Sequence, residues 1–108
     1  MIKFIIETVD NELANEIWTL KTEDIIFDYP FTKGEGSLLQ TITIYVTLAA
    51  SLITFARGLF ELIKSKEKKS QKKTKTIIHT KKGQVEMELK KLVATYEESI
   101  SIEIQEED

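Results

Sequence analysis

The chain has 108 residues, enough for one domain with a small core. Hydrophobic residues make up 42% of it and charged residues 31%, which is typical of globular proteins. The absence of cysteine excludes disulfides, a thiol nucleophile and Cys-based metal sites, and the single histidine, His79, excludes a His-rich metal site. A formal net charge of −3 argues against a generic nucleic-acid binder.

The first two elements follow from local pattern. Residues 1–9 are apolar and β-branched, which predicts a buried strand. Asp10 or Asn11 can cap a helix that runs through Leu20, because its apolar residues are spaced for one inward face.

A short strand and a loop are expected next. Residues 23–29 contain an apolar triplet and run into Pro30, which favours a second, short strand. Residues 31–36 include two glycines and predict a loop, after which Ser37 is placed to cap the following helix.

Residues 37–64 are predicted to form one long helix, the dominant element. Apolar side chains recur along it in alternating steps of four and three, the spacing of a single helix face. These positions are Leu38, Ile42, Tyr45, Ala49, Leu52, Ala56, Leu59 and Ile63. Such a helix would be about 42 Å long at ~1.5 Å per residue. We therefore expect part of its apolar surface to lie outside the cover that its own sheet provides.

The region after this helix is basic and then alternating. Residues 64–75 hold half of the lysines and predict a solvated helix end or basic loop. Residues 74–80 and 84–89 alternate as two strands, and Gly83 between them can take the positive φ of a hairpin turn.

The C-terminal part completes a single domain over residues 1–108. Residues 90–96 predict a short helix, 99–104 alternate with period two as a last strand, and 105–108 form an acidic tail. The order β-α-β-α(long)-β-β-α-β predicts an α+β fold, a two-layer sandwich of helices on a sheet.

Candidate chemistry is sparse. The glycine-containing segment 33–37 could hold an anion at a helix start, but it lacks the glycines and the lysine position of a phosphate-binding loop. His79 has no acid, serine or cysteine partner at a recognisable spacing, and Glu86 and Glu88 share a predicted strand face with nothing else converging. We expect no enzyme, cofactor or metal; a minimal enzyme or nucleotide sensor using 33–37 or His79 is a third hypothesis, after association and membrane insertion.

The sequence favours association as the mechanism. The protein-contact residues that we expect on the long helix are Leu48, Leu52, Phe55, Leu59 and Leu62. The residues expected to contact an anion or an acidic partner are Lys66, Lys68, Lys69, Lys72 and Lys73. We expect the partner to be either a second copy or another protein, in the cytoplasm.

Membrane insertion is the alternative function. Residues 36–56 hold 21 uncharged residues, which meets the length of ~20 for a membrane span, and lysines follow them. The polar residues of this run gather on one side of the helix, an arrangement that lipid does not favour. In this alternative, residues 38–63 would insert into the inner membrane.

The element order and three motifs carry a family resemblance. A Gly-Glu-Gly turn at 34–36 precedes the long helix, which ends in Ile53-Thr-Phe-Ala-Arg-Gly-Leu-Phe-Glu-Leu-Ile-Lys64, and a Gly83-centred hairpin follows. Over residues 2–97 the chain resembles the effector-associated constant component domains of bacterial conflict systems. The resemblance implies a non-enzymatic adaptor for separately encoded sensor or effector proteins of a defence system. The basic residues 66–75 and the strand at 99–104 are additions to that pattern.

Overall fold

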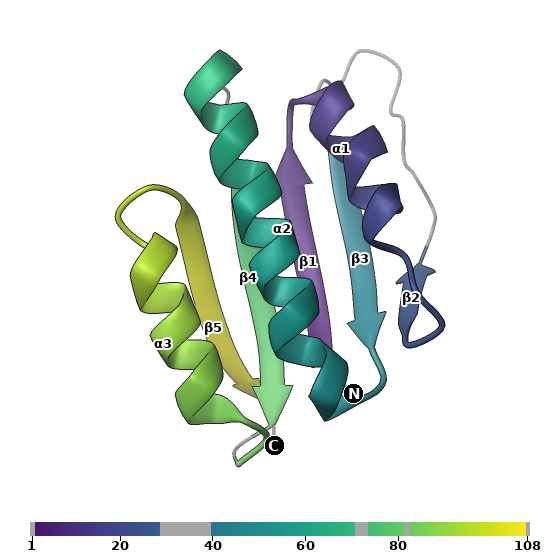
Figure 1. Ribbon diagram of the computed structural model, residues 1–108, viewed down its shortest axis with the longest axis vertical. Coiled ribbons are helices and arrows are strands. Elements are labelled where there is room, and N and C mark those ends of the chain that lie inside the picture. Colours follow the sequence, from purple (N-terminus) through teal and green to yellow (C-terminus); the bar gives the residue numbers. More distant parts are fainter. Residues whose placement is uncertain (1, 29–39, 71–73, 82, 108) are drawn as a thin grey trace.

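The computed structural model of the 108-residue chain describes residues 2–28, 40–70, 74–81 and 83–107. Figure 1 shows how the elements of this part of the chain are arranged. In chain order they are β1 (Ile2–Thr8), α1 (Asn11–Ile17), a short 3-10 helix (Trp18–Leu20), β2 (Ile25–Asp28), β3 (Gln40–Val46), α2 (Ala49–Ser70), β4 (Thr74–Lys81), α3 (Glu86–Tyr96) and β5 (Ser101–Glu107).

The strands form one sheet in the order β2-β3-β1-β4-β5. β1 is antiparallel to β3 and β4, and β2 is antiparallel to β3, whereas β4 and β5 are parallel. A parallel pair cannot be joined by a tight turn, and α3 forms the crossover between these two strands. α1, α2 and α3 all lie on the same side of the sheet (Figure 1). The predicted α+β fold with two layers is confirmed, and its element order matches in outline.

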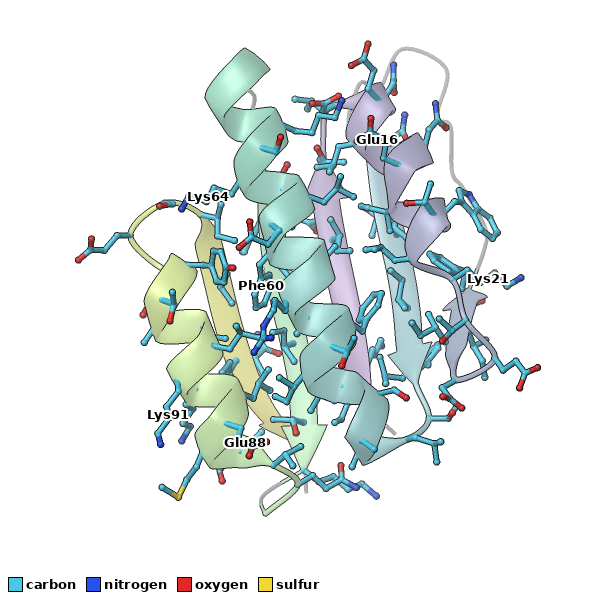
Figure 2. The ribbon with its side chains drawn as sticks, viewed as in Figure 1. Glu16, Lys21, Phe60, Lys64, Glu88 and Lys91 are labelled. Atoms are coloured by element: carbon cyan, nitrogen blue, oxygen red, sulfur yellow. The ribbon has the colours of Figure 1, made fainter. Side chains whose placement is uncertain are left out.

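The core lies between the sheet and the helices α1, α2 and α3. Side chains along β1 alternate in burial, and Ile2, Phe4 and Ile6 enter the layer beneath the helices. The rings of Phe4 and Phe55 meet edge to face, with centroids 5.2 Å apart. Phe60 lies between α2 and α3 (Figure 2), where its ring contacts that of Tyr96.

Local sequence explains the elements that were predicted correctly. The strands expected at 1–9, 23–29, 74–80 and 99–104 are confirmed as β1, β2, β4 and β5. Asp10 caps α1, because its Oδ1 accepts hydrogen bonds from the backbone N–H groups of Glu12 at 3.0 Å and Leu13 at 3.2 Å. The loop at 31–36 and the Ser37 cap lie outside the described residues.

The predicted helix at 37–64 is wrong in its first part. Residues 40–46 form β3, and α2 begins at Ala49. Threonine, isoleucine, tyrosine and valine dominate 41–46, and these residue types favour a pleated strand. Ile42 and Tyr45 therefore do not share a helix face: Ile42 is buried, while Tyr45 is half-buried and points to the opposite side of the sheet.

The predicted hairpin is also wrong. Gly83 does adopt a positive φ, of 91°, but the turn leads into α3 and not into a strand at 84–89. Two acidic residues in the first turn of α3 interact favourably with the positive end of the helix dipole. Leu89, Val93 and Tyr96 are buried at helical spacing, so this face covers the β4–β5 side of the sheet.

The two polar segments differ from their predictions as well. α2 continues through Ser70 and β4 begins at Thr74, so most of the predicted basic loop at 64–75 belongs to regular elements. β5 extends to Glu107, so the predicted tail at 105–108 is largely strand. Its parallel pairing with β4 explains this, because Gln105 and Glu106 each have a partner residue there.

Candidate functional site: the open face of the sheet

The predicted apolar contact residues do not form an accessible surface. Leu52 and Leu59 are fully buried and Phe55 is 4% exposed, all three within the core of the single chain. Leu62 is partly buried and packs against that core, and Leu48 is the one member of the set that is exposed, at 53%. The sheet thus covers the apolar face of α2, and the prediction that this face is exposed and available to a partner is wrong.

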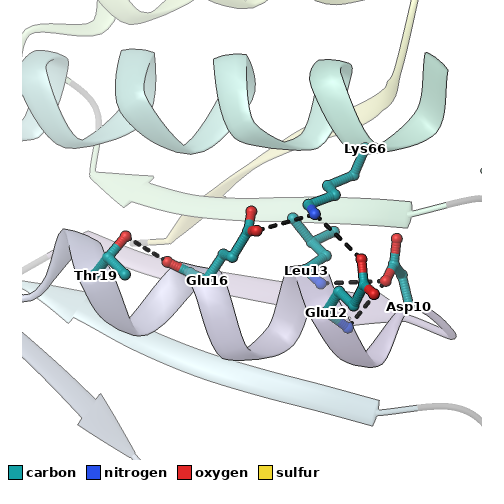
Figure 3. Close-up of polar contacts among 6 residues, drawn as sticks. All are labelled: Asp10, Glu12, Leu13, Glu16, Thr19 and Lys66. Atoms are coloured by element: carbon teal, nitrogen blue, oxygen red, sulfur yellow. Dashed lines mark hydrogen bonds and ion pairs between the residues drawn. The ribbon is translucent and has the colours of Figure 1, made fainter. Parts of the chain in front are cut away.

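The predicted lysine set is occupied in part by a contact within the chain. The Lys66 Nζ atom lies 2.9 Å from Glu16 Oε1 and 3.3 Å from Glu12 Oε2, both on α1 (Figure 3). The hydrogen bond to Glu16 is the largest cause that raises the pKa of Lys66, with Glu12 acting in the same direction and burial opposing both. Lys66 therefore joins α2 to α1. The side chains of Lys68, Lys69, Lys72 and Lys73 lie outside the described residues.

Those candidate catalytic groups that the structure describes are not brought together. Segment 33–37 lies outside the described residues, and His79 is half-buried on β4, on the side of the sheet away from the helices. Glu86 and Glu88 are on α3 and not on a strand, and Glu86 forms an ion pair of 2.6 Å with Lys90. The hydrogen bond that Lys90 donates to Glu86 in this ion pair is the main cause that lowers the pKa of Glu86.

Two further properties bear on the class of site. Within the described part of the chain, no group of three or more His, Asp or Glu side chains is placed to hold a metal ion. None of the described helices combines the length and apolar character needed to cross a membrane. The helix at 38–63 that membrane insertion required is replaced by β3 and α2.

The sheet has a second face, which none of the described helices covers (Figure 1). We call it the open face and define it by the residues of each strand that alternate with the core residues. Its described members are Ile26 and Asp28 on β2, Thr41, Thr43 and Tyr45 on β3, Lys3, Ile5 and Glu7 on β1, Lys75, Ile77, His79 and Lys81 on β4, and Ser101, Glu103 and Gln105 on β5.

The centre of the open face is apolar. Ile5 on β1 is paired in register with Ile77 on β4 and, on its other side, with Thr43 on β3. Tyr45 and Ile26 are likewise paired across β3 and β2, and Ile26 is 48% exposed. Tyr45 lies diagonally opposite Ile5, because its aligned partner on β1 is Lys3 and the aligned partner of Ile5 on β3 is Thr43. Diagonal neighbours are within reach of an aromatic side chain, so Ile26, Tyr45, Ile5 and Ile77 form an apolar area over four strands that Thr43 and Lys3 adjoin.

Charged residues surround this apolar centre. Glu7 on β1 is paired with Lys75 on β4, at the end of the sheet where α2 finishes. Lys3 lies two residues from Ile5 on the same face, and Glu103 on β5 is paired with Ile77. An apolar centre with a charged border is the usual anatomy of a protein–protein interface.

The open face was missed because its residues come from five separate segments. Side chains alternate between the two faces along each strand, but no single segment specifies the strand order that places Ile5 beside Ile77. Comparisons of the chain with models of protein families, with curated proteins and with solved structures found no match.

Proposed function

We propose that this protein is a non-enzymatic protein–protein interaction module that associates through the open face of its sheet. The observation that carries the proposal is that two adjacent cross-strand rows, one with Ile26 and Tyr45 and the other with Ile5 and Ile77, lie on a face that no described helix covers. A two-layer fold normally places one face of a sheet against helices; a second apolar face gains free energy, at about 25 cal/mol per Å², when another protein covers it.

The resemblance to effector-associated constant component domains supports the same class of function. It suggests an adaptor of a bacterial conflict or defence system, with a separately encoded sensor or effector protein among its partners. The open face replaces α2 as the proposed surface of association, because the apolar side of α2 is buried within the chain.

Site-specific photo-cross-linking in cells that produce the protein tests this proposal. A photoreactive amino acid replaces Ile77 on the open face, and as a matched control it replaces Lys91, which is exposed on the outer side of α3 (Figure 2). We expect a covalent adduct from position 77 and none from position 91. The additional substitution Ile5→Glu should remove the adduct. Association would then have to remove the introduced carboxylate from water, which costs free energy.

The control separates a specific surface from general stickiness. Lys91→Glu, combined with the label at 77, should leave the adduct unchanged. A label at 77 that forms no adduct, or an adduct that Ile5→Glu leaves intact, would show that the open face is not the surface of association.

A further inference from the structure

We infer that the partner on the open face is a second copy of this chain, bound about a two-fold axis that runs along the strands between β1 and β4. The inference rests on the proposed function, since it names the occupant of the same surface. In such a dimer two sheets pack face to face between two outer layers of helices, in the manner of a β-sandwich.

The axis is chosen by the residue register. A two-fold axis between β1 and β4 places β1 of one copy over β4 of the other. Rotation about this axis does not shift residues along the strands, so each β1 residue faces, in the second copy, the β4 residue with which it is paired in its own sheet. Ile5 then lies over Ile77 of the second copy, and Glu7 lies over Lys75 of the second copy. Each contact occurs twice by symmetry, so the interface has an apolar centre and two pairs of opposite charges.

β3 and β5 give a second set of contacts about the same axis. β3 of one copy lies over β5 of the other, which places Thr43 over Glu103 and Tyr45 over Gln105 of the second copy. A hydroxyl group can donate to a carboxylate, and a phenol can exchange a hydrogen bond with an amide. Among the described residues, no two carboxylates face each other in this arrangement.

The alternative two-fold axis is disfavoured by charge. An axis perpendicular to the strands, through the row that contains Ile5, would place each residue of that row over its own copy. Asp28 would then face Asp28 and Glu103 would face Glu103 at the two ends of the row. Like charges in a closed interface are strongly unfavourable, so the axis along the strands is the one we infer.

The size of the face sets the expected affinity. Four strands about 4.8 Å apart and seven residues at ~3.3 Å each cover roughly 19 Å by 23 Å, about 450 Å² for each copy. The total of about 900 Å² lies below the ~1,200 Å² of most stable complexes, which indicates a dimer that forms at high concentration. Sedimentation equilibrium from micromolar to millimolar concentration is therefore the suitable measurement.

Charge exchange provides the decisive variants. Glu7→Lys places a lysine over Lys75 of the second copy, and Lys75→Glu places a glutamate over Glu7. Each variant alone should dimerise about tenfold more weakly than the natural chain. An equimolar mixture should recover the affinity, because the lysine introduced in one variant then faces the glutamate introduced in the other and the second pair keeps its natural charges. Lys91→Glu is the matched control and should dimerise as the natural chain does.

The outcomes distinguish the inference from the proposed function. If the natural chain is monomeric throughout the concentration range, the inference that the partner is a second copy is overturned. An adduct of position 77 with a different protein would still support the proposed function as an interaction module. A mixture that dimerises no better than the single variants overturns the two-fold arrangement. Circular dichroism of each variant confirms that it is folded before its association is measured.

Discussion

Ile77 on β4 lies directly opposite Ile5 on β1, and both side chains project from the face of the sheet that no described helix covers. The neighbouring residue, Ile78, points the other way and is fully buried beneath the helices. Two adjacent isoleucines of one strand therefore have different surroundings: Ile78 is packed in the core, and Ile77 is on the outer surface of the sheet.

This difference predicts unequal losses of stability. Ile78→Ala should reduce the free energy of unfolding by about 2–5 kcal/mol, because it removes buried methyl groups and leaves a cavity. Ile77→Ala should cost less than about 1 kcal/mol when measured on the monomer, since its surroundings are partly solvent. Urea unfolding at low protein concentration measures both. Equal losses would mean that the open face is packed as tightly as the core.

The burial of Leu59 predicts unfolding, and not dissociation, when it is replaced by a charged residue. Leu59→Asp puts a carboxylate into the core at a cost of several kcal/mol, against a net stability of about 5–15 kcal/mol for a domain. Thr54→Asp on an exposed position of the same helix is the matched control and should remain folded. Circular dichroism and thermal unfolding distinguish them; a folded Leu59→Asp chain would contradict the observed core.

The sequence was informative where local pattern and tertiary contact agree. Residues 1–9 are rich in β-branched residues and residues 99–104 alternate with period two. Both patterns predict strands, and both segments form strands in the sheet. The segment 40–46 was misassigned because Ile42 fits both a helical seam and a two-residue alternation. Ile44 and Val46 decide the matter, since they continue the alternation and are buried with Ile42.

The C-terminal misassignment has a different physical origin. Residues 84–89 alternate as a strand would, yet Leu89 also begins the helical series that continues with Val93 and Tyr96. The parallel pairing of β4 and β5 requires a crossover between them, and α3 provides it. The open face depends on strand order in the same way, so no single segment could have predicted it.

The cap of α1 gives a local test of the N-terminal region. Asp10→Ala removes the acceptor of two backbone N–H groups and should lower the free energy of unfolding by about 0.5–2 kcal/mol. Asn15→Ala on the exposed side of the same helix is the control and should not destabilise the protein, because alanine is the better helix former. Chemical unfolding of both variants measures the difference, and equal stabilities would argue against the cap.

The contact between Tyr96 and Glu61 predicts a loss of stability at alkaline pH. The Tyr96 hydroxyl donates a hydrogen bond to the Glu61 carboxylate, and this bond, then burial and the charge of Glu61, raise the pKa of the phenol above its ordinary value. The unfolded chain therefore loses this proton at about pH 10, while the folded chain still holds it. Because the unfolded state then binds fewer protons, the contribution of this contact to stability is constant below about pH 10 and falls as the pH rises further.

Tyr96→Phe isolates this contribution, since Lys66 also has a raised pKa and weakens the fold over the same alkaline range. The difference in unfolding free energy between the natural chain and Tyr96→Phe should be constant from neutral pH to about pH 9 and should shrink above pH 10. Urea unfolding across that range measures the difference. A gap that stays constant, or widens, as the pH rises would mean that the phenol and the carboxylate do not share a proton in the folded protein.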